Sequence, residues 1–62
     1  MNIHILIGQI YEDESGEEYE VINVATTGIK LQTSDGEILR LGLEELLDNI
    51  EARTLVLQQD VE

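Results

Sequence analysis

The chain has 62 residues, with 14 acidic against 3 basic side chains and a formal net charge of −11. This surface should repel nucleic acid and anionic membranes, because phosphates are bound by Lys and Arg. Without cysteine the chain forms neither disulfides nor thiolate metal sites, while its apolar fraction of 42% is enough for a folded core and excludes disorder. We therefore expect one domain over residues 1–62, of marginal stability because short chains bury little surface.

The N-terminal residues MNIHILIG lack the basic start and long apolar stretch of a signal peptide. No apolar run approaches the roughly 18 residues that span a bilayer, so we expect a cytoplasmic protein. Residues 2–11, NIHILIGQIY, are rich in β-branched side chains and predict a first strand. Gly8 lies where the apolar alternation changes face, which indicates a bulge or a sharp bend.

The next segments predict a hairpin. The stretch EDESGEE, residues 12–18, forms its turn, with Ser15 and Gly16 at the tip, and residues 18–25 form the second strand. Strict alternation puts Tyr19, Val21 and Asn23 on one face and Glu18, Glu20, Ile22 and Val24 on the other. Tyr11 and Tyr19 are expected to pair across the two strands, stiffening the hairpin.

Residues 29–33 alternate cleanly and predict a third strand, with Ile29 and Leu31 facing inward. A two-residue loop after it would mix core and solvent faces with the fourth strand. A three-residue loop, 34–36, instead pairs Leu31 with Leu39 and Ile29 with Leu41, and it suits a left-handed glycine at its last position. We therefore predict the longer loop, which also sets Lys30 beside Arg40 on the outer face.

Residues 43–51 change period and predict a short helix. Its apolar face consists of Leu43, Leu46, Leu47 and Ile50, and its opposite side of Glu44, Glu45, Asp48 and Glu51. Residues 53–58 predict a last strand, and residues 59–62 a frayed end.

The resulting order is β-β-β-β-α-β, a mainly β protein. Four meandering strands, a short helix and a closing strand resemble a small SH3-like barrel, the fold of Tudor and KOW modules. The resemblance rests on element order over nearly the whole chain and on no specific motif. The helix of about two turns is longer than the single turn usual there, so a strongly bent, open antiparallel sheet is the alternative.

The stretch YEDESGEEYE, residues 11–20, holds six carboxylates and no basic residue. Carboxylates on alternate residues of a strand lie about 6.6 Å apart, a spacing comparable with that of phosphates along a nucleic-acid strand. The simpler interpretation is a solvated hairpin tip, and halophilic adaptation would also explain the acidity. The acidic side of the predicted helix favours a functional interpretation, because unbalanced charge on two elements costs stability.

The sequence gives little support for metal binding or for catalysis. The acids of residues 12–18 lack the regular spacing of a calcium loop, so we expect no metal and no cofactor. His4 is the only histidine and the only candidate general base, no nucleophile motif accompanies it, and Ser15 and Ser34 belong to turns. We expect no enzyme.

We expect a small acidic protein-binding module, an inhibitor that occupies a basic, nucleic-acid-binding surface of a partner as a DNA mimic. In size and charge it resembles the small acidic inhibitors that bacteriophages encode. The alternatives are an assembly module that acts through homo-oligomerisation, such as a homodimer, and a peptide-binding SH3-like domain with a groove beside the tyrosines. The expected partner-binding residues are Glu12, Asp13, Glu14, Glu17, Glu18 and Glu20, followed by Glu44, Glu45 and Asp48.

Overall fold

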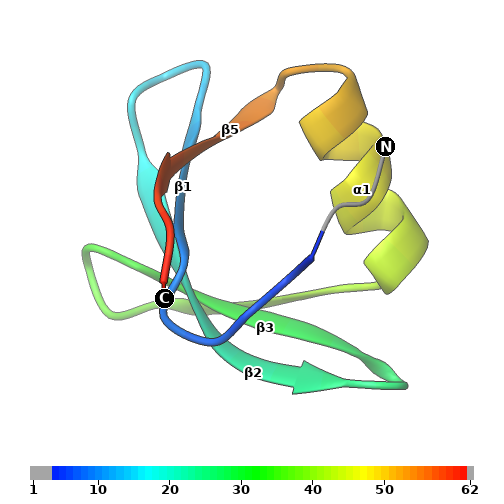
Figure 1. Ribbon diagram of the computed structural model, residues 1–62. Helices are drawn as coiled ribbons and strands as arrows, with labels where there is room; N and C mark the ends of the chain where they lie inside the picture. Colours follow the sequence, from blue (N-terminus) through cyan, green and yellow to red (C-terminus); the bar gives the residue numbers. More distant parts are fainter. Residues whose placement is uncertain (1–3, 62) are drawn as a thin grey trace.

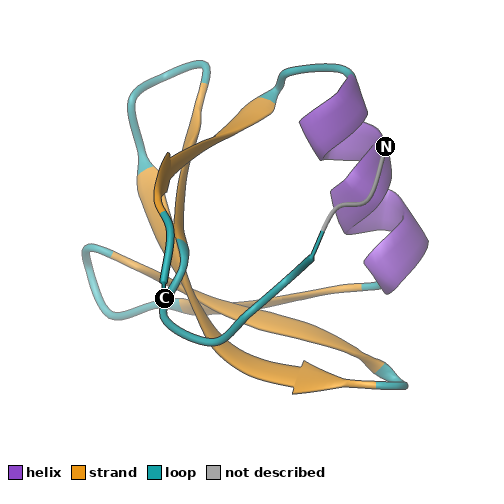
Figure 2. Ribbon diagram, in the orientation of Figure 1, coloured by secondary structure: helices purple, strands orange, loops and turns teal. Residues whose placement is uncertain are grey.

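The computed structural model describes residues 4–61, which form one five-stranded antiparallel sheet and one helix in the order β-β-β-β-α-β (Figure 2). The strands are β1 (Ile10–Asp13), β2 (Glu18–Ala25), β3 (Gly28–Thr33), β4 (Ile38–Leu41) and β5 (Leu55–Gln59), and the helix is α1 (Leu43–Glu51). The strand order is β4-β3-β2-β1-β5, so β4 and β5 are the two edges. Figure 1 shows that the sheet is strongly curved and that α1 lies across its concave side. The predicted mainly β fold and its element order are confirmed.

Two of the three hairpins, β1–β2 and β3–β4, share one loop design. In the first, the Gly16 amide donates to Asp13 O at 3.1 Å and the Asp13 amide to Glu17 O at 2.9 Å. In the second, the Gly36 amide donates to Thr33 O at 3.0 Å. Both glycines are left-handed, with φ of 90° and 89°, where a Cβ atom would be strained. The predicted three-residue loop at 34–36 is therefore confirmed.

The predicted register of β3 and β4 is also confirmed. Leu31 lies opposite Leu39, and Ile29 lies opposite Leu41. Lys30 and Arg40 are paired on the outer face, where both side chains are exposed. A shift of one residue would have exchanged these two faces, so the apolar pattern and the glycine loop select the same pairing.

Four strands and the helix contribute side chains to the core. Its buried members are Tyr11, Val21, Ile29, Leu31, Leu46 and Leu55. Leu46 is fully buried under the sheet, while the helix acids on the opposite side are exposed. The 3.6-residue periodicity thus predicted the helix at its observed bounds and the burial of Leu46. Leu47 and Ile50 of the predicted apolar face are half-buried, whereas Leu43 is 48% exposed. Within residues 4–61 no helix is long and apolar enough to cross a membrane.

The prediction of one strand over residues 2–11 is wrong for residues 4–9. The strand begins only at Ile10, and a turn at Ile7–Gly8 precedes it, with a φ of 99° at Gly8. The strand continues to Asp13, two residues past the predicted end, so the turn predicted at residues 12–18 is confined to residues 14–17. Ile7 is 59% exposed. Residues 2 and 3 lie outside the described part of the chain. The local preference of the isoleucines for extended structure is overridden because the left-handed glycine ends the pairing with β2, which the bend predicted at Gly8 anticipated.

Gln9 anchors this irregular segment. Its buried side chain donates to His4 O at 3.1 Å and to Asp60 Oδ1 at 2.7 Å, and its Oε1 accepts from the Leu6 amide and the Tyr11 hydroxyl. All four hydrogen-bonding positions of the amide are thereby used. Gln9 therefore joins both ends of the chain to β1.

Three further predictions need correction. A bulge between Val21 and Asn23 in β2 pairs Asn23 with Lys30, so Asn23 lies on the outer face and not beside Tyr19. The last strand runs over Leu55–Gln59, because Arg53 is left-handed (φ 63°) in the turn after α1. The predicted frayed end is also wrong for residues 59–61, since Gln59 belongs to β5 and Asp60 accepts from Gln9.

Candidate functional site

Glu12 and Glu18 lie directly opposite each other on β1 and β2. Since the Asp13 amide bonds to Glu17 O, the alternation of an antiparallel ladder makes the neighbouring Glu12–Glu18 pair a non-hydrogen-bonded one. In such a pair the Cα atoms are only about 4.5 Å apart and the side chains are close. Two like charges directly opposite each other destabilise a sheet.

Glu20 extends this pair along the outer face of β2. It lies two residues from Glu18, about 6.6 Å along the strand, with the uncharged Ile10 and Gln32 as its cross-strand neighbours. A shallow hollow of about 120 Å³ is lined by Glu18 and Glu20 together with Ile10, Gln32, Thr33 and Ser34. We call Glu12, Glu18 and Glu20 the outer acidic face.

Asp13 has a different role from these three acids. Its Oδ1 accepts from the Ser15 amide, the Ser15 hydroxyl and the Glu17 amide at 2.9, 2.7 and 3.0 Å, and its Oδ2 accepts from the Tyr19 hydroxyl at 2.7 Å. These bonds, the one from Ser15 Oγ foremost, lower the pKa of Asp13 to about 2. The hydrogen bond that the Tyr19 hydroxyl donates to Asp13 raises the pKa of Tyr19 to about 12. Asp13 is therefore an internal brace of the hairpin turn.

The remaining predicted acids are distributed over two other places. Glu14 is exposed at the tip of the hairpin, and Glu17 is half-buried beside it, with the Ser34 hydroxyl 3.5 Å from its Oε1. Glu44, Glu45 and Asp48 are exposed on the side of α1 that points away from the sheet. Along β1 and β2 the residues of the outer acidic face alternate with the inward-facing Tyr11, Tyr19 and Val21, so they lie on the side of the sheet away from the core. Helix α1 lies on the concave, core side (Figure 1). The structure therefore does not bring the helix acids together with the outer acidic face.

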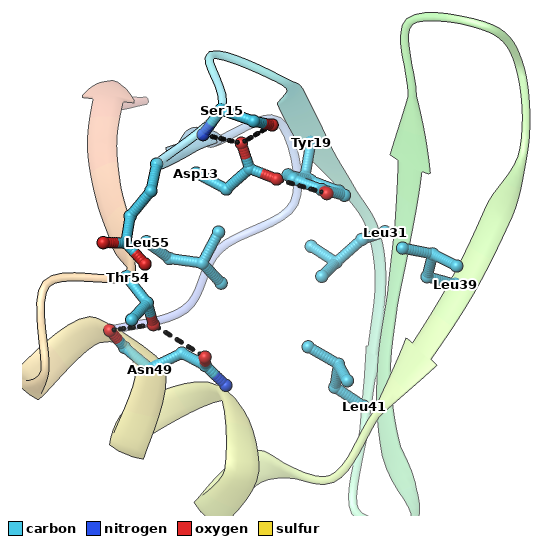
Figure 3. Close-up of a pocket in the computed structure, with 10 residues that line it drawn as sticks. Asp13, Ser15, Tyr19, Leu31, Leu39, Leu41, Asn49, Thr54 and Leu55 are labelled. Atoms are coloured by element: carbon cyan, nitrogen blue, oxygen red, sulfur yellow. Dashed lines mark hydrogen bonds between the residues drawn. The ribbon is translucent and has the colours of Figure 1, made fainter.

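An apolar pocket of about 410 Å³ opens on the concave side. It lies between the first hairpin turn, β3 and β4, and the junction of α1 with β5, as Figure 3 shows. Its lining consists of Leu31, Leu39, Leu41 and Leu55, with Asp13, Glu14, Ser15, Tyr19, Asn49 and Thr54 as the polar part. The volume is within the range of ligand-binding clefts.

The predicted pairing of Tyr11 with Tyr19 is confirmed. Tyr11, however, is only 2% exposed and its hydroxyl is bonded to Gln9 Oε1, whereas Tyr19 lines the pocket. Burial, with the nearby Asp60 charge, raises the pKa of Tyr11. The two rings therefore do not form an aromatic cage.

Sequence reasoning placed Leu31, Leu39 and Leu41 on the inner face and did not predict a pocket among them. A groove beside the tyrosines was expected only for the alternative of a peptide-binding domain, and Tyr19 does line this pocket. Leu39 faces inward as expected but is 37% exposed, because β4 is an edge strand and α1 contacts the sheet elsewhere, at β3 and β5. No group of three or more His, Asp or Glu side chains suited to a metal ion occurs within residues 4–61, where His4 is exposed. Comparisons of the chain with protein-family models, curated proteins and solved structures give no match.

Proposed function

We propose that this protein is a small acidic protein-binding module that occupies a basic, nucleic-acid-binding surface of a partner protein, as a DNA mimic. The observation that carries the proposal is the directly opposed pair Glu12–Glu18, extended by Glu20, on a face with no lysine or arginine as their direct cross-strand neighbour. This arrangement destabilises the free hairpin. A small protein that retains such a charge array has a use for it in binding.

The hairpin presents these charges on a rigid support. Asp13 holds the turn through four hydrogen bonds, and Tyr11 is buried in the core directly across from Tyr19. A preorganised charge array loses little conformational entropy when it binds. A basic groove built for phosphates would therefore meet carboxylates that project from a rigid backbone, with Glu18 and Glu20 about 6.6 Å apart along the strand.

The strand order, with β5 returning beside β1 after a helix, supports placing the fold among SH3-like barrels. The nine-residue helix departs from the usual SH3-like barrel, and so do the outer edges of β4 and β5, with which no strand of residues 4–61 pairs. The acidic side of α1 is a separate surface in this proposal, secondary to the outer acidic face. The site of action that we propose is the cytoplasm, where nucleic-acid-binding enzymes work.

Two variants of equal net charge test the proposal. The first carries Glu12→Gln, Glu18→Gln and Glu20→Gln, and the second carries Glu44→Gln, Glu45→Gln and Asp48→Asn. Each is immobilised beside the unchanged protein and exposed to lysate of a candidate bacterial host, with duplex DNA as competitor. We expect a partner that is retained by the unchanged protein and the helix variant, is lost from the hairpin variant, and is released by DNA.

Equal retention by both variants would show that net charge alone is responsible and would contradict the proposal. Sedimentation of the free protein provides a second check. A stable homo-oligomer that buries the β1–β2 hairpin would also contradict it and would favour an assembly role.

A further inference from the structure

The outer edge of β4 offers free main-chain hydrogen-bonding groups. Because the Thr33 amide bonds to Glu37 O, alternation along the ladder directs the main-chain groups of Leu39 and Leu41 toward β3. The amides and carbonyls of Ile38 and Arg40 then point away from the sheet. Within residues 4–61 no strand pairs with this side of β4. An extended peptide has partners for its own main chain here.

The apolar pocket begins at this same edge. Leu39 and Leu41 on the inner face of β4 line it together with Leu31 of the neighbouring strand β3 (Figure 3). Leu39 is 37% exposed, so a second aliphatic side chain placed on it would bury further apolar area. The pocket thus favours an aliphatic side chain from a strand paired with β4.

The far rim of the pocket is acidic. Glu14 is exposed there, and Asp13 lies beside it. The other polar groups of the rim bond among themselves, since the Thr54 hydroxyl donates to Asn49 Oδ1 at 2.7 Å and Asn49 Nδ2 donates to Glu45 O at 2.8 Å. The unbalanced charge is therefore negative, and its complement is a lysine or arginine on the same face of the occupant as the aliphatic side chain.

We infer that β4 binds an extended peptide segment of another protein, which adds a strand to the sheet and carries an aliphatic residue and a Lys or Arg two positions apart. The aliphatic side chain packs on Leu39 and Leu41, and the cation reaches the Glu14 rim. Main-chain pairing supplies affinity and the two side chains supply specificity, as in other cases of strand addition. This site lies on the concave side, so it stands apart from the outer acidic face and does not depend on the function proposed for it.

A second copy of the chain does not fit these requirements. Its β4 strand has Ile38 and Arg40 two positions apart on one face, but their main-chain groups are the free ones, so an antiparallel pairing of two β4 strands would set these side chains beside their counterparts on the outer face, away from the pocket. Its β5 strand, Leu55–Gln59, contains no basic residue. Two copies at a net charge of −11 also repel each other. The occupant is therefore a different, cationic chain.

The test is an NMR titration of the isotope-labelled full chain with the peptide acetyl-TLTKT-amide, in which Leu and Lys share one face of a strand. The matched control is acetyl-TLTET-amide. With the first peptide we expect the NMR signals of the Ile38 and Arg40 amides to shift. So short a segment binds weakly, so the titration uses millimolar peptide; a Kd of 1 mM corresponds to a binding free energy of roughly −4 kcal/mol. The control peptide should bind at least several-fold more weakly.

Two pairs of protein variants locate the contacts. Leu39→Ala should weaken binding about tenfold, whereas Leu57→Ala, at the other edge and similarly exposed, should not. Glu14→Gln should weaken binding about two- to fivefold, whereas Glu12→Gln on the outer face should leave it unchanged. Glu14 lies in an exposed turn, so its variant keeps the test valid if Leu39→Ala unfolds.

Three results would overturn the inference. Equal binding of the two peptides would remove the charge argument, and shifts centred on β5 would move the site. Shifts of Ile38 and Arg40 that depend on protein concentration without peptide would show that a second copy occupies the edge. Absence of any shift up to about 5 mM peptide would show that β4 takes no such strand.

Discussion

Asp13 is a structural residue of the hairpin turn, unlike the free acids that surround it in the sequence. The sequence presents it as one of six carboxylates in ten residues, yet it accepts four hydrogen bonds within its own hairpin. An Asp before a Ser and Gly in a turn is a recognised local signal, because its carboxylate bonds to amides two residues ahead. That signal could have separated Asp13 from the free acids, whereas the bond from the Tyr19 hydroxyl depends on the strand register.

The brace at Asp13 predicts a specific pH dependence of stability. Its pKa of about 2 in the folded protein is below the ordinary 3.8, so its contribution is present above pH 4 and is lost as the pH falls toward 2. Asp13→Asn should therefore unfold at a lower temperature than the unchanged protein at pH 5. The difference between the two melting temperatures should become smaller toward pH 2. Thermal unfolding followed by circular dichroism measures both.

The control is Glu14→Gln, one residue away. Its difference in stability from the unchanged protein should not shrink between pH 5 and pH 2. In Asp13→Asn the absorbance titration of Tyr19 should also move from a pKa of about 12 back toward the ordinary 10.0. An equal loss of stability in Asp13→Asn at pH 5 and at pH 2, with no change in the pKa of Tyr19, would show that the Asp13 carboxylate does not brace the turn.

At the scale of elements, sequence reasoning succeeded where a periodic pattern and a tertiary partner agree. Strand β2 and helix α1 were predicted at their observed bounds, 18–25 and 43–51. It failed at residues 4–9, where Gly8 turns the chain and Gln9 ties it to Asp60, 51 residues away. It also missed the bulge after Val21, since nothing in the alternation of β2 reveals an unpaired residue.

The opposed pair Glu12–Glu18 predicts that Glu18→Lys stabilises the hairpin. A lysine opposite Glu12 replaces repulsion with attraction, so the free energy of unfolding should rise by about 0.2–1 kcal/mol. Glu20→Lys makes the same change of charge without a facing carboxylate, and its gain should be smaller. Urea denaturation of the three proteins at low salt measures the difference.

Equal gains for the two variants would show that only net charge matters and that the pair is not strained. If the function proposed above is right, Glu18→Lys also abolishes partner binding. Stability and binding would then change in opposite directions, as is common for residues retained for function.

For the whole molecule, the distribution of charge is the main result. The outer acidic face and the acidic side of α1 point in different directions, and the basic pair Lys30–Arg40 lies on the outer face across β3 and β4. The amount of acid was evident from the sequence, whereas its separation into two surfaces required the fold. A single flat partner surface therefore contacts one acidic surface at a time.

The salt dependence of two quantities tests the central claim most directly: the affinity of the outer acidic face for its basic partner, and the melting temperature of the free protein. Raising NaCl from about 0.05 M to about 0.5 M shortens the screening length to a few ångströms. The complex captured by the unchanged protein should weaken at least about tenfold, because charge complementarity dominates it. The melting temperature should rise, because salt relieves the self-repulsion of a chain at −11. An affinity that persists unchanged to roughly 1 M salt would contradict the proposal that this protein binds as a mimic of nucleic acid.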